Sequence, residues 1–300
     1  MHHETDLLSA FEPQKQFFIG IDSDGCVFDT MEIKHKECFC PAFINHFELQ
    51  PASKYAREVW EFVNLYSDTR GINRFKAVLR ALELYNERDE VILRKAAVPR
   101  LQGLQSWVET EKKLGNPALE AELERNPKTD LERVYRWSCE VNRAVEKIVR
   151  NVPPFPYVHE SLTTVREKAD SIVVSQTPLE ALQREWAEQE LNGYVRFIAG
   201  QEMGRKSEHL ARAAGSKYPE GHILMIGDAP GDLTAARENN ALFYPVIPGA
   251  EEDSWQRFSE EALDRFLEGT YAGTYETELI EEFRSSLPET PFWKRSTIHE

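Results

Sequence analysis

The sequence has few cysteines, no long apolar run and no basic tract, and each shortage argues against a class of protein. Its four cysteines form no CxxC pair and are too few for a disulfide framework. We expect them to be reduced thiols in apolar surroundings, without a zinc site. No run reaches the about 18 apolar residues of a membrane-spanning helix, and the N-terminal stretch lacks the apolar core of a signal peptide. The expected location is therefore the cytoplasm, away from membranes.

Acidic residues outnumber basic ones by 51 to 36, which gives a formal net charge of -15. A protein of this charge repels nucleic acids and anionic membranes unless a local basic patch intervenes, and the sequence contains no such tract. A small anionic substrate remains compatible, because a few cationic side chains and a metal ion can give a cleft a positive field. The oligomeric state is left open.

Short apolar runs that end in polar residues or glycine predict buried parallel strands. The runs are residues 17–22, 171–177, 194–200, 222–228 and 241–249. Apolar side chains at helical spacing lie between the later runs. Strands that alternate with helices predict an α/β fold, a doubly wound parallel sheet of the Rossmann-like type.

The segment between the first two predicted strands, residues 30–154, is far too long for an ordinary crossover. It has the 3.6-residue periodicity of helices, as in the apolar stripe over residues 75–82. We therefore expect an inserted all-α domain over 30–154, with 1–29 and 155–300 forming the sheet domain. Three prolines between residues 153 and 156 disfavour helix and predict an extended return linker.

Carboxylates follow two of the predicted strands directly. Asp22 and Asp24 come after the first strand, and Asp228 ends the fourth. Ligands of open parallel sheets bind just beyond the carboxyl ends of the strands, so these groups can converge. Converging carboxylates repel one another unless a cation neutralises them, which implies a hard, oxygen-preferring ion such as Mg²⁺. Beside such an ion, one carboxylate can attack phosphorus while a second protonates the leaving oxygen and later deprotonates water.

In their order along the chain, the motifs resemble those of the haloacid dehalogenase superfamily. These motifs are DSDGCVFDT, Ser175 at the end of SIVVS, Lys206 in GRKSEHL, and GDAPGD at residues 227–232. The resemblance covers about residues 15–30 and 155–250. The helical insert occupies the place where this superfamily has its type-one cap domain.

The resemblance implies that Asp22 is the nucleophile and that Asp24 is the general acid and base. The backbone carbonyl of Asp24 would also bind Mg²⁺. Ser175 would hydrogen-bond the transferring phosphoryl group, together with backbone N–H groups after it, beginning at Gln176. These assignments describe phosphoryl transfer through an aspartyl-phosphate.

The remaining members of the site are also implied by the resemblance. Lys206 would pair with Asp22 and with the phosphoryl oxygens, which balances charge in the transition state. Asp228 would ligate Mg²⁺ directly. Asp232 would bind the ion through water or orient Lys206. Asp29 is interpreted differently, as a cap of the first helix of the insert.

Two arginines in the insert, Arg70 and Arg74 in SDTRGINRF, are a candidate substrate contact. The segment is loosely similar to the glycine-and-arginine hinge with which β-phosphoglucomutases hold a non-transferring phosphate. A solvated helix end with two arginines four residues apart is the alternative interpretation. In the functional interpretation, one of these arginines contacts the distal part of the substrate, and cap closure expels water.

The acid at position 24 narrows the set of reactions that the protein could catalyse. Dehalogenases and phosphonoacetaldehyde hydrolases resemble this pattern but lack an acid there, so Asp24 favours phosphate-ester or anhydride chemistry. The prediction is a Mg²⁺-dependent phosphatase that acts on a small phosphorylated metabolite. The alternatives are a phosphomutase and a catalytically silent binding protein that keeps the scaffold.

The segment from Ala250 onward has helical periodicity and a strongly acidic composition. Trp255, Phe258 and their apolar neighbours predict a face that packs back onto the sheet domain, behind a helix cap at Ser254. The final stretch TPFWKRSTIHE has no periodicity. It is either a mobile tail or an oligomer contact.

Overall fold

The computed structural model describes residues 7–294, which divide into two compact units. The sheet unit comprises the described residues up to Met31 together with Asn151–Pro288. The helical unit comprises Glu32–Arg150 together with the described residues from Glu289 onward. The chain therefore passes from one unit to the other three times. Among the residues described, no helix is both long and apolar enough to cross a membrane.

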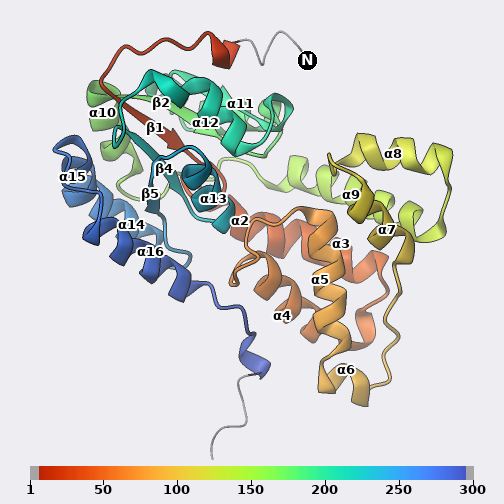
Figure 1. Cartoon of the computed structure of the whole chain (residues 1–300). Helices are drawn as coiled ribbons and strands as arrows, with labels where there is room; N and C mark the ends of the chain where they lie inside the picture. The colour runs from red at the N-terminus through yellow and green to blue at the C-terminus, as the bar shows by residue number, and fades with distance from the viewer. Residues whose placement is uncertain (1–6, 295–300) are drawn as a thin grey trace, which may run out of the picture. The chain divides into compact units, whose positions relative to one another are not determined.

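The sheet unit is built on one parallel sheet of five strands within the described part of the chain. The strands are β1 (Phe17–Ile21), β2 (Ala169–Val174), β3 (Phe197–Ala199), β4 (Ile223–Gly227) and β5 (Leu242–Pro245). Their order across the sheet is β3-β2-β1-β4-β5, and every neighbouring pair is parallel (Figure 1). Each predicted apolar run overlaps one strand, and β2 begins two residues before its run. The predicted doubly wound α/β fold is confirmed.

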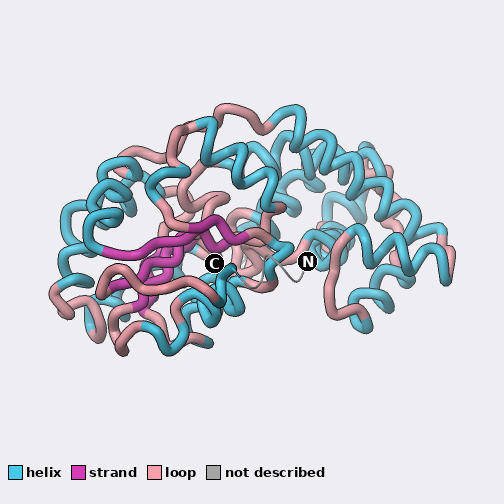
Figure 2. The backbone as a smooth tube through the Cα atoms, turned by 90° about the horizontal axis from the view of Figure 1, so that it is seen from above, coloured by secondary structure: helices cyan, strands magenta, loops and turns pink. Residues whose placement is uncertain are grey.

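Helices cover both faces of this sheet (Figure 2). The side chains of α10 (Val158–Lys168), α11 (Leu179–Glu188), α14 (Glu251–Arg257) and α15 (Leu263–Leu267) share one apolar cluster with Ile19 and Ile21 of β1. Those of α12 (Lys206–Ala213) and α13 (Pro230–Glu238) share another with Phe18. The last helix, α16 (Thr274–Ser286), packs on β5 and contributes to both clusters. β1 therefore lies at the centre of the unit, buried on both faces.

Short helical turns complete the sheet unit. They are η3 (Asn192–Tyr194), η4 (Gln201–Met203), η5 (Gly215–Lys217) and the π-helical η6 (Phe258–Ala262). The return segment 151–157 has no helix, as predicted, and α10 begins at Val158. Phe28 pairs with Pro154 in an antiparallel bridge, and the Phe155 N–H donates to Val27 O at 2.9 Å. The outgoing and returning chains are thus joined by backbone pairing.

Residues 251–288 pack on the sheet as predicted, because Trp255, Phe258 and their apolar neighbours are buried in the clusters on its two faces. The predicted helix cap at Ser254 is wrong. Helix α14 begins at Glu251, and three acidic residues in its first turn favour that start through the helix dipole. Ser254 lies inside the helix, where its hydroxyl donates to Ala250 O at 2.8 Å and accepts the Ile247 N–H at 3.0 Å.

The described residues of the helical unit form helices and connecting loops without a strand. The helices are α2 (Thr30–Ile33), which begins within the sheet unit, η1 (Lys34–Phe39), α3 (Cys40–His46), η2 (Gln50–Ala52), α4 (Ser53–Asn64), α5 (Arg74–Asn86), α6 (Asp89–Leu93), α7 (Gln102–Thr110), α8 (Asn116–Arg125), α9 (Thr129–Ile148) and η7 (Phe292–Lys294). Trp60 and Trp137 are fully buried at the core, with ring centroids 5.9 Å apart. The predicted apolar stripe over residues 75–82 lies in α5, where Phe75, Val78 and Leu82 are buried.

The residues after Pro288 pack on the helical unit, whereas the sequence prediction assigns them to the sheet domain. The Trp293 ring lies 5.4 Å from that of Phe62, and the Arg88 guanidinium lies 4.5 Å over the Trp293 ring. Lys294 forms an ion pair with Glu87. Aromatic burial and a cation–π contact therefore hold this segment. The rest of the predicted tail, residues 295–300, lies outside the described residues.

Candidate active site

The carboxyl ends of three adjacent strands meet at one edge of the sheet. Asp22 follows β1, Ser175 follows β2 and Asp228 follows β4. The Asp22 N–H still belongs to the ladder and donates to Ile226 O of β4 at 2.9 Å. The chain goes from β1 to one side of the sheet and later returns to the other, so this edge is the topological switch point. Ligands of doubly wound folds bind at such a point.

A buried cluster of carboxylates occupies this edge. Asp22, Asp228 and Asp232 each place one oxygen within 4.8 Å of the others. Their exposed fractions are 4%, 1% and 0%, so solvent screens their mutual repulsion poorly. The Lys206 ammonium lies 2.7 Å from Asp22 Oδ2 and 2.7 Å from Asp232 Oδ1. Lys206 therefore places its positive charge between two of the three carboxylates, Asp22 and Asp232.

The pKa values reflect this excess of buried acid. Burial raises the pKa of Asp22 to about 6, with a further increase from Asp228, although Lys206 opposes it. Burial likewise raises the pKa of Asp232 to about 7. Burial alone would lower the pKa of Lys206, but the charges of Asp22 and Asp232 outweigh it and raise that pKa, so the lysine is a cation.

The donor set fits a hard divalent cation. The three groups are all carboxylates, they are buried together, and their negative charge exceeds that of the one ammonium beside them. Mg²⁺ prefers oxygen ligands and carboxylates in particular. A divalent ion among Asp22, Asp228 and Asp232 would favour their ionised forms and offset the cost of their burial.

A tight loop after β1 shapes the site. Gly25 has a φ of 74°, in the left-handed region that favours glycine, and its N–H donates to Phe28 O at 2.8 Å. The Ser23 N–H donates to Asp22 Oδ1 at 2.8 Å, which fixes one oxygen of that carboxylate. Cys26 is fully buried in apolar surroundings, as predicted. Asp29 is exposed and immediately precedes α2.

Two threonines hold the Asp24 side chain. The Thr30 hydroxyl donates to Asp24 Oδ1, and the Thr177 hydroxyl donates to Oδ2 at 2.6 Å. The Thr177 N–H in turn donates to the Ser175 hydroxyl at 3.1 Å. The sequence analysis missed both threonines. The only signal for Thr177 is a second hydroxyl two residues after Ser175.

Gly227 makes room for Asp232. A Cβ on Gly227 would lie 2.3 Å from Asp232 Cγ, closer than real Cβ atoms come to a neighbour. With the glycine in place, Asp232 Oδ2 accepts the Ala229 N–H at 3.1 Å while its Oδ1 faces Lys206. Asp232 therefore caps α13 and positions the lysine at the same time.

Three predicted substrate contacts have protein partners. Gln176 Nε2 donates to the backbone oxygen of Gly204 at 2.9 Å, so its side-chain amide is bound to the protein backbone. Arg70 is buried in the helical unit and donates to Leu65 O at 2.9 Å. Arg74, also in the helical unit, is taken up separately below. Asp22, Lys206, Asp228 and Asp232 are the predicted residues that the structure brings together directly.

Arg74 is a half-buried cation held by neutral groups. Its Nη1 donates to Ser138 Oγ at 3.0 Å and to Asn142 Oδ1 at 2.6 Å. Its guanidinium lies 5.0 Å over the Phe39 ring. Burial lowers the pKa of Arg74 to about 10, so the group stays charged at neutral pH. The structure thus shows a charged arginine fixed within its own unit.

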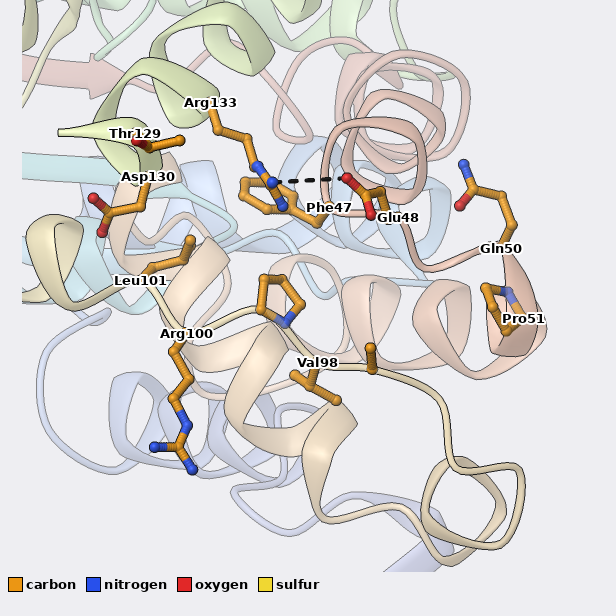
Figure 3. A pocket seen from close by; sticks show the side chains of 12 residues that line it. Phe47, Glu48, Gln50, Pro51, Val98, Arg100, Leu101, Thr129, Asp130 and Arg133 are labelled. Atoms are coloured by element: carbon orange, nitrogen blue, oxygen red, sulfur yellow. Dashed lines mark ion pairs between the residues drawn. The ribbon is translucent and has the colours of Figure 1, made fainter.

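The helical unit also contains a pocket of about 820 Å³ (Figure 3). It lies between the end of α3, the loop before α7 and the start of α9. Neither Arg70 nor Arg74 lines it. Three of its charged groups have protein partners, because Arg133 Nη2 lies 3.7 Å from Glu48 Oε1 and Asp130 Oδ2 accepts the Gly103 N–H at 2.6 Å. No predicted site residue lines it.

Comparison with known proteins gives structural similarity only. No protein-family model and no curated protein matches the sequence. A solved structure from Lactobacillus delbrueckii subsp. bulgaricus, assigned as a phosphoglycolate phosphatase, is 16% identical with a TM-score of 0.48, over 87% of this chain and 100% of that chain. A haloacid dehalogenase-like hydrolase from Streptococcus pneumoniae is 13% identical with a TM-score of 0.42, over 82% and 91% of the two chains.

A third similar structure, a hydrolase of the same kind from Bacillus subtilis bound to magnesium, is 13% identical with a TM-score of 0.42, over 77% of this chain and 86% of that chain. The family that the motifs resemble thus recurs among the similar solved structures. At these identities the activity of this chain has to be inferred from its own side chains.

Proposed function

We propose that this protein is a Mg²⁺-dependent phosphatase of the haloacid dehalogenase superfamily, which hydrolyses a small phosphorylated metabolite through an aspartyl-phosphate on Asp22. One observation carries the proposal. Asp22, Asp228 and Asp232 are buried together with Lys206 at the switch point of a parallel sheet. A purely structural role for three buried carboxylates and one ammonium would be costly in stability.

Asp22 is the proposed nucleophile. Its Oδ1 accepts a hydrogen bond from the Ser23 N–H, and its Oδ2 accepts one from the Lys206 ammonium. The carboxylate is therefore held in one orientation. Attack of one oxygen on phosphorus forms the acyl phosphate and displaces the alcohol of the substrate. Lys206 lies where it can also contact the transferring phosphoryl group, and its positive charge favours the transition state.

Asp24 is the proposed general acid and base. It follows the nucleophile by two residues, and its carboxylate accepts hydrogen bonds from two hydroxyls rather than from Lys206. As an acid it would give its proton to the leaving oxygen. As a base it would then take a proton from the water that hydrolyses the acyl phosphate and regenerates Asp22.

The other groups complete the charge balance. Asp22, Asp228 and the Asp24 carbonyl would hold Mg²⁺, with Asp232 beside them. When bound, the ion neutralises phosphoryl and carboxylate charge. Ser175 and the N–H groups after it would hydrogen-bond the phosphoryl oxygens from the β2 side, since Ser175 ends that strand.

The test is phosphate release from a panel of sugar phosphates, nucleotides and small phosphorylated acids, each with Mg²⁺ and with EDTA. Wild type is assayed beside Asp22→Asn. Release that needs the metal and disappears in the variant supports the proposal and identifies a substrate class. Release that is unchanged in Asp22→Asn, or absent for every compound, contradicts it.

A further inference from the structure

Two buried tryptophans donate hydrogen bonds into the loop that carries Asp24. Trp186 Nε1 of α11 donates to the Ser23 hydroxyl at 3.0 Å. Trp255 Nε1 of α14 donates to the Cys26 carbonyl at 2.7 Å. Both indoles have an exposed fraction of 0%. The loop is therefore held on both sides of Asp24, one residue before it and two residues after it.

These contacts reach the loop from distant parts of the chain. Trp186 is 163 residues from Ser23, and Trp255 is 229 residues from Cys26. Trp186 also packs edge-on against Phe28, with ring centroids 5.7 Å apart, and Phe28 is bridged to Asp24. The ring of Trp186 thus supports the loop at a second point besides the hydrogen bond.

Hydrogen bonds in a dry environment fix geometry closely, because a donor that loses its partner there is left without water as a substitute. Ser23 and Cys26 are both fully buried. Asp24 lies between them and is less buried, so the two tryptophan contacts add fixed points on either side of its backbone to the hydrogen bonds within the loop. Proton transfer requires hydrogen-bond distance to the leaving oxygen, and misplacement by about 1 Å can cost about a hundredfold in rate.

We propose that Trp186 and Trp255 are positioning residues for the proposed reaction, which hold Asp24 where it can protonate the leaving group. The inference rests on the proposed phosphatase activity. It also gives the segment after Ala250 a function in the site, since α14 supplies Trp255. The indole N–H groups are the essential atoms, and the rings provide the packing around them.

The variants separate the hydrogen bond from the packing. Trp186→Phe and Trp255→Phe remove the N–H but keep an aromatic ring. Ser23→Ala removes the acceptor of Trp186 and leaves that ring in place. Trp60→Phe is the matched control, because Trp60 is equally buried but its Nε1 has no hydrogen-bond partner among the described residues. Melting temperatures of all variants report their packing cost.

Two substrates isolate the proton transfer. A nitrophenyl phosphate has a weakly basic leaving group that departs without protonation, whereas an alkyl phosphate requires an acid. The probes are p-nitrophenyl phosphate and the alkyl phosphate that wild type hydrolyses fastest in the panel. Lost folding would lower kcat/KM for both substrates by the same factor, so the ratio of the two kcat/KM values reports how well Asp24 protonates the leaving group.

We expect Trp186→Phe, Ser23→Ala and Trp255→Phe to lower kcat/KM on the alkyl phosphate about tenfold, because kcat/KM reports the steps up to the departure of the alcohol. On p-nitrophenyl phosphate kcat/KM falls less than about threefold. The Ser23→Ala/Trp186→Phe double variant loses no more activity on the alkyl phosphate than either single variant, because the same hydrogen bond is lost in all three. Trp60→Phe leaves the ratio of rates unchanged.

Equal losses on the two substrates, or additive losses in the double variant, would overturn the inference while leaving the phosphatase intact. Unchanged kcat/KM on the alkyl phosphate in properly folded Trp186→Phe and Ser23→Ala would overturn it as well. A wild type that hydrolyses neither probe overturns the proposed function, and the inference with it. The two failures are thus distinguished by the wild-type assay.

Discussion

The two units use charge in different ways. In the sheet unit, four charged side chains meet in a buried cluster, where Lys206 lies 2.7 Å from each of two carboxylates. In the helical unit, the charged Arg74 is held by the neutral Ser138 and Asn142. The first arrangement is coupled, since Lys206 lowers the pKa of Asp22 and of Asp232 while both carboxylates raise the pKa of Lys206. The second is a single cation fixed by uncharged partners.

The difference indicates where chemistry and where recognition are expected. A coupled buried cluster can balance a charge that moves during reaction. A cation fixed by neutral groups keeps its charge available for an anionic ligand. Variants that disturb the buried charge cluster should therefore act on kcat, Arg74 variants on KM, and variants of charges outside both on stability alone. Four substitutions test this distinction, in order of decreasing effect on turnover.

Asp22→Asn should have the largest effect. The amide cannot form the acyl phosphate, so we expect kcat to fall by at least about a thousandfold. The measurement is steady-state phosphate release, with circular dichroism as the control for folding. A folded variant with normal turnover would remove Asp22 from the mechanism.

Gly227→Ala should come second. The added Cβ would meet Asp232 at 2.3 Å, so Asp232 has to move away from Lys206. We expect kcat to fall about a hundredfold through loss of this positioning. Gly231→Ala is the matched control four residues later, since a Cβ there has no heavy atom within 4 Å. Equal activity of the two variants would show that the position of Asp232 is unimportant for turnover.

Arg74→Ala tests the helical unit. If Arg74 binds an anionic part of the substrate, its loss should raise KM about tenfold and leave kcat within about twofold, because such a contact is made equally in the ground state and the transition state. Full kinetics on the substrate found in the panel provide the measurement. Unchanged KM and kcat would remove Arg74 from the site and leave it a structural role, through its hydrogen bonds to Ser138 and Asn142.

Asp170→Asn should leave turnover unchanged and lower stability. Asp170 lies near the start of β2, at the opposite end of that strand from Ser175. Its carboxylate accepts the Gln14 and Lys15 N–H groups and the Tyr218 hydroxyl. Burial alone would raise the pKa of Asp170, but these hydrogen bonds outweigh it and lower that pKa.

The pH dependence follows from this lowered pKa. The stabilisation by Asp170 is fully present above its unfolded pKa of about 3.9 and is lost as the pH falls through the lower folded value. The variant should thus be less stable by about 1–3 kcal/mol at neutral pH. The gap should narrow below about pH 4. Urea unfolding of both proteins between about pH 3 and pH 7 measures the difference in their free energies of unfolding. A difference that grows in acid would contradict the lowered pKa of Asp170.

The sequence predicted the parts of the structure that depend on short-range pattern. The apolar runs located every strand, and strand ends located Asp22 and Asp228. Lys206 and Asp232 were predicted only through their motifs, because their ion pair joins residues 26 positions apart. The site itself therefore followed from local signals and a family resemblance.

The supporting contacts could not be predicted, because they depend on tertiary packing. Thr177 reaches Asp24 across 153 residues, and Trp255 reaches Cys26 across 229. A tryptophan at helical spacing indicates burial but does not indicate the direction of its N–H. The prediction of a helix cap at Ser254 was wrong for a related reason. A serine hydroxyl can also hydrogen-bond a carbonyl within a helix, as that of Ser254 does with Ala250 O.

The third passage of the chain between the units, after Pro288, has a consequence for building chimaeras. An insert joined by two neighbouring segments can be exchanged as one cassette. Here Leu287 is buried in the sheet unit, while Trp293 stacks on Arg88 of the helical unit. A transplant of residues 32–150 alone would leave Arg88 without that ring. A functional graft of this cap would have to carry a second piece, residues 289–294, taken from the far end of the chain.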